Sequence, residues 1–151
     1  ITGAQGTARP EKLKASISYH YGWKCVGTLV YSAPDELIKA RTADQIVRQR
    51  LLDLDLKFEK LHTEYFGVNA CHGDLAPIVP EPPEVQLRMG VRDTDKQKIE
   101  RFTRELIPLV LSGPPAATGY GEGRPPVREI VAYWPALLAR DIIQPRVEMI
   151  E

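Results

Sequence analysis

The sequence has 151 residues, of which 43% are hydrophobic and 26% charged, and its 20 basic side chains balance its 20 acidic ones. A chain of this length can bury a core of its own without disulfides or a structural metal. The zero net charge and the lack of basic runs argue against a nucleic-acid-binding protein, and the apolar stretches are far shorter than the roughly 20 residues that cross a bilayer. We therefore expect neither nucleic acid nor a membrane among its partners.

The N-terminus and the cysteines indicate the context of the chain. It begins with Ile1 rather than Met, which indicates a piece of a longer protein, and no signal peptide is visible. Cys25 and Cys71 show no CxxC or CxxH spacing, so we expect free thiols in a reducing compartment and a cytoplasmic location. We expect residues 1–151 to form a single domain, which is the C-terminal domain or a fragment of that longer protein.

The first part of the chain predicts two strands and a helix. Residues 13–19 and 23–31 are rich in alternating, β-branched and aromatic side chains, which predicts a hairpin that turns at residues 20–22. The sequence Ser-Ala-Pro-Asp at residues 32–35 is typical of a helix start, with the serine as N-cap. Apolar residues then recur every three or four positions, which predicts a helix over residues 34–53.

Two further strands are predicted over residues 61–68 and 85–91. The second has a strict alternation of apolar and polar positions. Between them, residues 69–84 contain four prolines, which exclude a helix or a central strand. This segment is therefore predicted to be a surface loop.

The last third of the chain predicts a second helix and two closing strands. Thr94 and Gln97 have the spacing of a capping box, and the apolar pattern behind them predicts a helix that runs to about residue 111 with a bend at Pro108. A loop rich in glycine and proline follows. Strands are then predicted over residues 127–134 and 147–150.

These elements predict the fold class. Each helix has a single apolar stripe to bury, so both helices should cover one face of a sheet whose strands are joined by short connections. We expect an α+β fold, a two-layer sandwich with a mostly antiparallel sheet and two amphipathic helices on one face, in the order ββα-ββα-ββ.

Several short segments, in their order and spacing, resemble one family. They are KLKASISY at residues 12–19 with Gly22 after it, YSAP at 31–34, FGV at 66–68 ahead of HG at 72–73, SGPP at 112–115 and RPPVRE at 124–129. Over roughly residues 8–149 the chain resembles the C-terminal part of the acyclic terpene utilisation (AtuA) family. None of these segments is a catalytic signature.

The resemblance implies a role in the catabolism of branched acyclic terpenoids of the citronellol and geraniol type, in a pathway that acts on acyl-CoA thioesters. It also implies a large α/β portion before this region, so an N-terminal AtuA-like domain or a companion chain is the expected partner. The ligand that it implies is an acyl-CoA or a terpenoid. It supplies no set of active-site residues.

Cys71, His72 and Asp74 are the candidate catalytic residues. A thiol, an imidazole and a carboxylate within four residues could form a nucleophile with a base, or part of a metal site. The other two histidines, His20 in the predicted hairpin and His62 in a predicted strand, have no ligand spacing. We therefore expect no metal and no cofactor, and a hydrogen-bonded loop is the alternative to a catalytic one.

Candidate ligand-binding residues cluster before the strand at 127–134. Tyr120, Glu122 and Arg124 lie in a glycine-rich loop whose amides and guanidinium suit a phosphate or a carboxylate, and Arg128 follows. The alternatives are a linker with purely backbone roles and a solvated ion-pair cluster that includes Glu129.

Tyr19 is a further candidate, because it belongs to an aromatic segment that could stack on a planar ligand or cover a prenyl chain. Packing within the hairpin is the alternative.

Three functional hypotheses follow. The first is a domain that supplies one wall or lid of an acyl-CoA or terpenoid site completed by the N-terminal domain. The second is a non-catalytic assembly module that pairs subunits into a homo-oligomer through an exposed sheet edge or an apolar helix face. The third is an independent small enzyme that uses Cys71 and His72, which requires the two side chains within hydrogen-bond reach.

Overall fold

A computed structural model describes residues 2–77, 80–118 and 123–149. The chain divides into two compact units. Residues 21–130 form the first, which we call the sandwich unit, and residues 1–20 with 131–151 form the second, which we call the ribbon unit.

Strand β1, Lys12–Ser32, contributes to both units and is a single strand of 21 residues. The predicted hairpin at residues 20–22 is therefore wrong. Gly22 has a φ of 103°, and a Cβ at this position would lie 2.7 Å from the carbonyl oxygen of Asp93. Glycine is required here by a backbone conformation inside a strand and by close packing against β3, not by a reversal of the chain.

In the sandwich unit the sheet has the strand order β2-β3-β1-β4, and each pair of neighbours in this order is antiparallel. Its other strands are β2, Lys60–Phe66, β3, Glu84–Asp93, and the short β4, Ala117–Thr118. Helix α1, Glu36–Asp53, connects β1 to β2. With β3 between β1 and β2, this is the split βαβ arrangement of ferredoxin-like folds.

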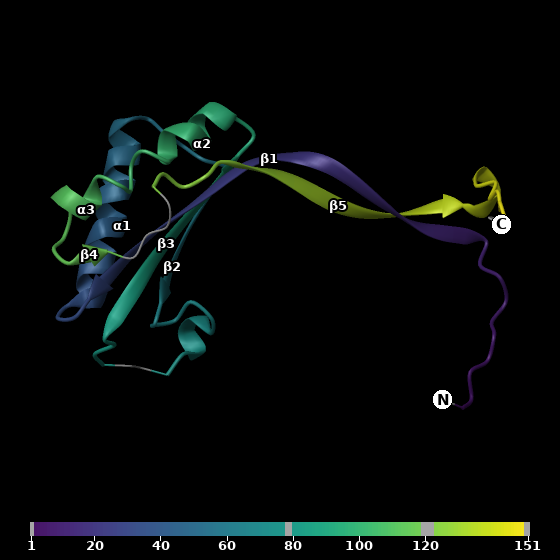
Figure 1. Ribbon diagram of the computed structural model, residues 1–151, viewed down its shortest axis with the longest axis horizontal. Coiled ribbons are helices and arrows are strands. Elements are labelled where there is room, and N and C mark those ends of the chain that lie inside the picture. Colours follow the sequence, from purple (N-terminus) through teal and green to yellow (C-terminus); the bar gives the residue numbers. More distant parts are fainter. Residues whose placement is uncertain (1, 78–79, 119–122, 150–151) are drawn as a thin grey trace. The chain divides into compact units, whose positions relative to one another are not determined.

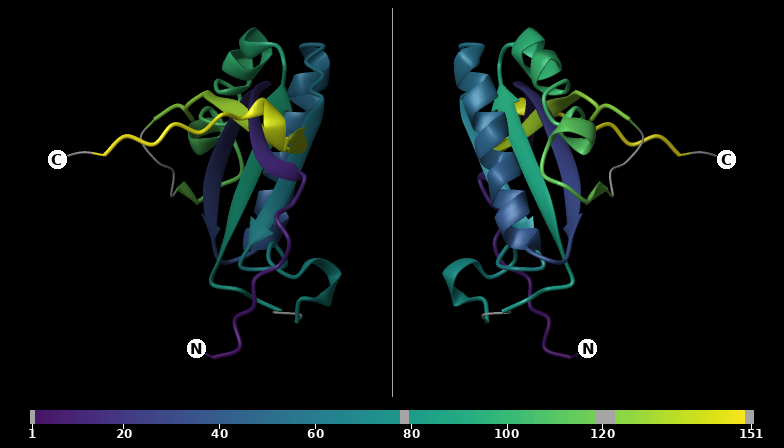
Figure 2. Two further views of the ribbon diagram at one scale, coloured as in Figure 1. Left: turned by 90° about the vertical axis from the view of Figure 1, so that its right-hand side faces the viewer. Right: turned by 90° about the vertical axis from the view of Figure 1, so that its left-hand side faces the viewer.

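Both longer helices cover the same face of this sheet (Figure 1). The strict alternation predicted for β3 puts every second side chain on that face, and Figure 2 shows α1 running alongside β3. Side chains from the sheet and from both helices form one buried cluster, which includes Leu29, Tyr31, Ala40, Val47, Leu87, Met89, Ile99 and Phe102. The predicted α+β class, with an antiparallel sheet, is confirmed; the described residues hold five strands and three helices.

Helix α1 ends where the sequence predicted but begins two residues later than expected, at Glu36. The residue before it, Asp35, has a φ of 62° and makes no side-chain capping bond. Ser32, the predicted N-cap, is the last residue of β1, and its carbonyl oxygen accepts a hydrogen bond from Lys39 Nζ at 2.6 Å. The side-chain cap predicted from Ser32 is therefore not formed.

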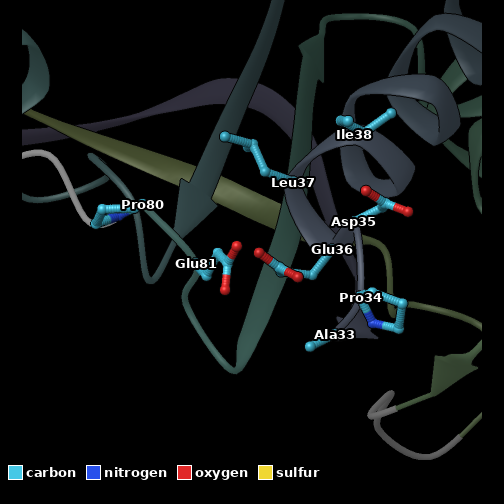
Figure 3. Close-up of a pocket in the computed structure, with 8 residues that line it drawn as sticks. All are labelled: Ala33, Pro34, Asp35, Glu36, Leu37, Ile38, Pro80 and Glu81. Carbon is cyan, nitrogen blue, oxygen red and sulfur yellow. The ribbon is translucent and has the colours of Figure 1, made fainter.

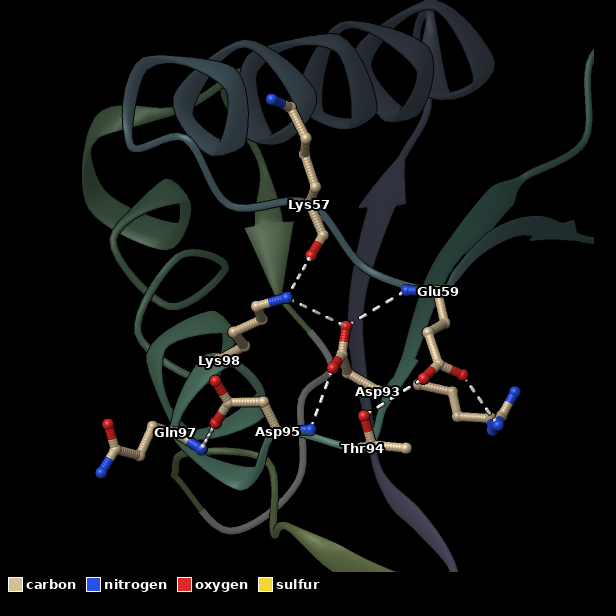
Figure 4. Close-up of polar contacts among 8 residues, drawn as sticks. Lys57, Glu59, Asp93, Thr94, Asp95, Gln97 and Lys98 are labelled. Carbon is tan, nitrogen blue, oxygen red and sulfur yellow. Dashed lines mark hydrogen bonds and ion pairs between the residues drawn. The ribbon is translucent and has the colours of Figure 1, made fainter.

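Where the sequence predicts one second helix, the structure has two short ones. They are α2, Lys96–Phe102, and α3, Leu109–Ser112, and turns separate them. Pro108 lacks an N–H and restricts the residue before it, and it stands at the N-cap of α3, but it does not account for the end of α2 six residues earlier. The cap also differs from the predicted box, because the Asp95 carboxylate, not Thr94, accepts the amide hydrogen bond of Gln97 at 2.8 Å (Figure 4).

Asp93 anchors the start of α2 through a network drawn in Figure 4. Its carboxylate is buried and accepts the amide hydrogen bonds of Asp95, at 2.9 Å, and Glu59, at 3.2 Å, with Lys98 Nζ 3.5 Å away. Burial alone would raise the pKa of Asp93, but these hydrogen bonds and the ammonium group bring it below the usual value. The polar groups at this junction are satisfied, so we assign the network a structural role.

The ribbon unit contains the first part of β1 and most of β5, Arg128–Ala139, and these two strands pair with each other. A 3₁₀ turn, η2, Arg140–Ile142, follows β5. Arg140 closes the ribbon, since its backbone N donates to the Glu11 carbonyl at 3.0 Å and its Nε to the Pro10 carbonyl at 2.9 Å. The predicted strand over residues 147–150 is not formed at 147–149; residue 150 lies outside the described part of the chain.

Candidate functional site

The loop after β2 carries the candidate catalytic residues. Cys71, His72 and Asp74 are all exposed, and Asp74 lies in a 3₁₀ turn, η1, Gly73–Leu75. Cys71 and His72 line one small cavity of about 200 Å³, which Asp74 does not line. Within the described residues, no hydrogen bond or ion pair joins these side chains, so the loop does not hold a nucleophile bonded to its base.

The candidate ligand-binding residues fall in three places. Tyr120 and Glu122 lie outside the described residues. Tyr19 belongs to the ribbon unit and is 41% exposed on β1. Arg124 is exposed on the segment that leads to β5, and Arg128, the first residue of β5, lines a cavity of the sandwich unit. Of these residues, therefore, only Arg128 lines a described cavity.

That cavity has a volume of about 300 Å³, and we call it the Lys24–Arg128 cavity. It is lined by Lys24, Cys25, Val26, Pro126 and Arg128. Strand β1 contributes the first three of these residues. Pro126 comes from the short segment before β5 that contains Pro125 and Pro126, which we call the proline-rich segment, and Arg128 is the first residue of β5.

Close packing of the proline-rich segment against β1 positions this cavity. The Cys25 thiol lies 3.8 Å from the carbonyl oxygen of Pro125, to which it donates a weak hydrogen bond. At Gly27, a Cβ would lie 3.2 Å from the Pro125 ring and 2.8 Å from Leu106. A larger residue at position 27 would therefore require the Leu106 side chain and the Pro125 ring to shift, so the lack of a side chain at Gly27 suits the close packing seen here.

The electrostatics of the cavity are positive. Among the described residues, no carboxylate forms an ion pair or hydrogen bond with Lys24 or Arg128, whereas the neighbouring Arg88 and Arg92 are both paired with glutamates. Two unpaired cations at one cavity favour an anionic group, and an arginine can hold a carboxylate or phosphate through two hydrogen bonds.

The remaining walls of the cavity are apolar. Val26 and Pro126 contribute apolar surface, and Cys25 contributes a buried thiol. Burial raises the pKa of Cys25 to about 12, so the thiol stays protonated at neutral pH and is a poor nucleophile. The arrangement can bind an anion that carries an apolar chain, but it supplies no activated nucleophile.

Lys24 is the residue of this cavity that sequence reasoning missed. It looked like an ordinary polar position in an alternating strand, because its proximity to Arg128 depends on pairing between β1 and a segment a hundred residues later. The one feature of the sequence that could have indicated Lys24 is that it is the only charged residue from Trp23 to Val30, among apolar or small residues.

Metal-binding clusters and membrane-spanning helices are both absent from the described residues. No group of three or more His, Cys, Asp or Glu side chains there could hold a metal ion. None of the described helices has both the length and the apolar character needed to span a membrane.

Comparison with known proteins gives one match. The family model of the acyclic terpene utilisation family protein AtuA matches residues 1–149, which is nearly the whole chain. No curated protein and no solved structure matches the chain. The resemblance seen in the short sequence segments is thereby confirmed, and the chain belongs to the acyclic terpene utilisation family.

Proposed function

We propose that the Lys24–Arg128 cavity binds the carboxylate or phosphate end of a branched terpenoid acid or its CoA thioester, and that an N-terminal domain or companion chain completes the site. Family membership supports the terpenoid part of this proposal. The observation that carries it is the pair of unpaired cations, Lys24 and Arg128, beside the apolar surface of Val26 and Pro126.

The size of the cavity supports a shared site. Ligand cavities usually measure 300–1,000 Å³, and this one, at about 300 Å³, lies at the lower limit. It suits the carboxylate and the first part of the chain of a terpenoid acid, or a phosphate group of CoA alone, but not a complete CoA thioester, whose acyl end is uncharged. The rest of such a ligand would need a wall from outside this chain.

Calorimetric titration with geranate, and with geraniol as its neutral counterpart, tests this proposal. We expect geranate to bind and geraniol to bind at least tenfold more weakly, because only the acid offers an anion to the two cations. Lys24→Gln and Arg128→Gln should each weaken geranate binding about tenfold, the loss of one charge-assisted hydrogen bond.

Matched controls separate local from general charge effects. Lys60→Gln and Arg104→Gln remove exposed cations from the same unit, away from the cavity lining, and should leave the affinity for geranate unchanged. Equal binding of geranate and geraniol, or equal losses in the cavity variants and the controls, would contradict the proposal.

A second candidate function, an assembly module, is favoured by the ribbon unit. A two-stranded ribbon by itself is marginally stable in water. This one exposes large apolar side chains on both strands, namely Ile17, Tyr19, Val131, Tyr133, Trp134, Leu137 and Leu138. An exposed apolar surface of this kind is typical of an interaction site.

The register of the ribbon concentrates part of this surface on one face. Extending the antiparallel ladder from the hydrogen bond between Arg140 and Glu11 pairs Ile17 with Trp134 and Tyr19 with Ala132. One face then carries only apolar side chains, whereas the other includes the lysines and serines of β1. In this register Pro135 removes a donor from the free edge of β5, which disfavours edge-to-edge pairing.

We propose a second copy of the chain as the occupant of the apolar face. Its large and small side chains alternate, with Trp134 between Ala132 and Ala136, so two copies can interdigitate about a twofold axis. A net charge of zero adds no repulsion between copies.

Analytical ultracentrifugation of the wild-type chain tests the assembly proposal. We expect a dimer that dissociates in Trp134→Glu, and an unchanged dimer in Ile38→Glu, which alters an exposed apolar residue of α1. A wild-type monomer at high micromolar concentration would contradict it.

A further inference from the structure

A second cavity of the sandwich unit, unrelated to the candidates from the sequence, lies where helix α1 begins. It measures about 400 Å³ (Figure 3). Its lining is formed by the segment from β1 into α1 and by part of the proline-rich loop before β3, namely Ala33, Pro34, Asp35, Glu36, Leu37, Ile38, Pro80 and Glu81.

Glu36 is the unusual residue of this cavity. Its side chain belongs to a residue that is only 5% exposed. Nevertheless, no hydrogen bond or ion pair to it is found within residues 2–77, 80–118 and 123–149. Figure 3 shows its carboxylate directed across the cavity toward that of Glu81, whereas the carboxylate of Asp35 points away.

The two carboxylates that face each other here favour a positive partner. Most of Glu36 is buried, but its carboxylate faces the cavity, where the Glu81 carboxylate on the opposite wall repels it. The positive end of α1 offsets only about half of one charge. Two other buried carboxylates of this unit, Asp93 and Glu105, are paired with lysine or arginine, whereas no such pair is found for Glu36 within the described residues.

We propose that this cavity binds an organic ammonium group, held between the carboxylates of Glu36 and Glu81, with its alkyl part against the apolar wall. Leu37, Pro34 and Pro80 supply that wall. Two carboxylates offer fewer ligands than a calcium or magnesium ion takes from its surroundings, and a cavity of about 400 Å³ is large for a bare ion but suits an amine with several carbon atoms. This site and its ligand are independent of the Lys24–Arg128 cavity, whose charge has the opposite sign.

Amide chemical-shift mapping on the full chain tests the proposal, with n-butylammonium as the probe. We expect saturable shifts at the amides of residues 35–38 and 81, with a dissociation constant on the order of a millimolar for so small a ligand. Lengthening the alkyl chain from methyl to hexyl should increase the affinity. The anion n-butyrate and the ion Mg²⁺ should give no saturable shifts at these amides.

Variants test whether the carboxylates of Glu36 and Glu81 bind the ammonium group. Glu36→Gln keeps the shape of the side chain and should weaken n-butylammonium binding about tenfold or more. Glu81→Gln alters an exposed residue and should also weaken binding, which keeps the test valid if the Glu36 variant fails to fold. Glu84→Gln, nearby but outside the lining, is the matched control and should bind like the wild type.

The proposal is overturned if the wild-type chain shows no saturable shifts with n-butylammonium. It is also overturned if Mg²⁺ gives the same shifts while the amine does not, or if Glu36→Gln and Glu81→Gln bind the amine as tightly as Glu84→Gln.

Discussion

The two parts of β1 have similar sequence patterns but different environments. In the sandwich unit, its odd-numbered residues Cys25, Leu29 and Tyr31 are fully buried under the helices. In the ribbon unit, the odd-numbered Ile17 and Tyr19 remain 47% and 41% exposed. Alternation therefore predicts a strand, but burial depends on whether other elements of the chain are available to cover its apolar face.

This contrast has a functional meaning. In the sandwich unit the apolar face of β1 is buried in the core and contributes to stability. The proposed binding residues of this unit line its cavities instead. In the ribbon unit the same kind of side chain contributes surface that is available to a partner. The predictions below test the contrast, starting with the largest expected effect.

The largest effect is expected from shortening matched apolar side chains in the two parts of β1. Leu29→Ala leaves a cavity in the core and should lower the free energy of unfolding by about 3 kcal/mol. Ile17→Ala, measured at a protein concentration low enough for the chain to be monomeric, should change it by less than about 0.5 kcal/mol. Urea denaturation followed by circular dichroism measures both values. Similar losses in the two variants would show that the two parts of β1 contribute equally to stability.

A smaller effect is expected at Asp93, where β3 meets α2. Asp93→Asn should lower the free energy of unfolding by about 2 kcal/mol, because hydrogen bonds to a charged group are lost. The folded-state pKa of Asp93 lies below its usual value of 3.8, so its charge stabilises the fold above that pH. This contribution disappears as the pH falls through the folded-state pKa.

Denaturation curves of the wild type and Asp93→Asn at several pH values check this. The difference in stability should be constant between pH 5 and 7 and should shrink below about pH 4. A difference that does not depend on pH would assign the loss to packing rather than to the charge.

The last prediction concerns how fast the two thiols react with a reagent, and it involves no change in stability. Cys25 is buried with a pKa of about 12, whereas Cys71 is exposed on its loop. A maleimide reagent at pH 7.5 should label Cys71 rapidly and Cys25 only after unfolding. Peptide mass spectrometry identifies the labelled residue, and rapid labelling of Cys25 in the folded chain would contradict its burial beside the Lys24–Arg128 cavity.

Local patterns explain how much of the fold could be predicted. The alternation in residues 85–91 and the apolar periodicity behind residues 32–35 gave β3 and α1 to within about two residues, because each is encoded in consecutive side chains. Gly22 was misread as a turn, since a positive φ inside a strand and a chain reversal favour the same residue.

The sites were harder to predict, because they depend on contacts between distant segments. Arg128 was a candidate in the sequence, but its neighbour Lys24 was not, since only strand pairing brings the two to one cavity. Glu36 looked like an ordinary acidic residue at a helix start, and its burial opposite Glu81 follows from the path of the loop before β3. The catalytic role suggested for Cys71, His72 and Asp74 stays a prediction, as do the cytoplasmic location and the N-terminal partner.

The central claim is that Lys24 and Arg128 hold the anionic end of a terpenoid acid. Amide shift mapping of the isotope-labelled chain during titration with geranate tests it most directly. The account predicts saturable shifts at residues 24–26 and 128 that need about tenfold more geranate in Lys24→Gln and that geraniol produces only at far higher concentration. Shifts confined to the exposed apolar residues of the ribbon unit, and equal for geranate and geraniol, would contradict it.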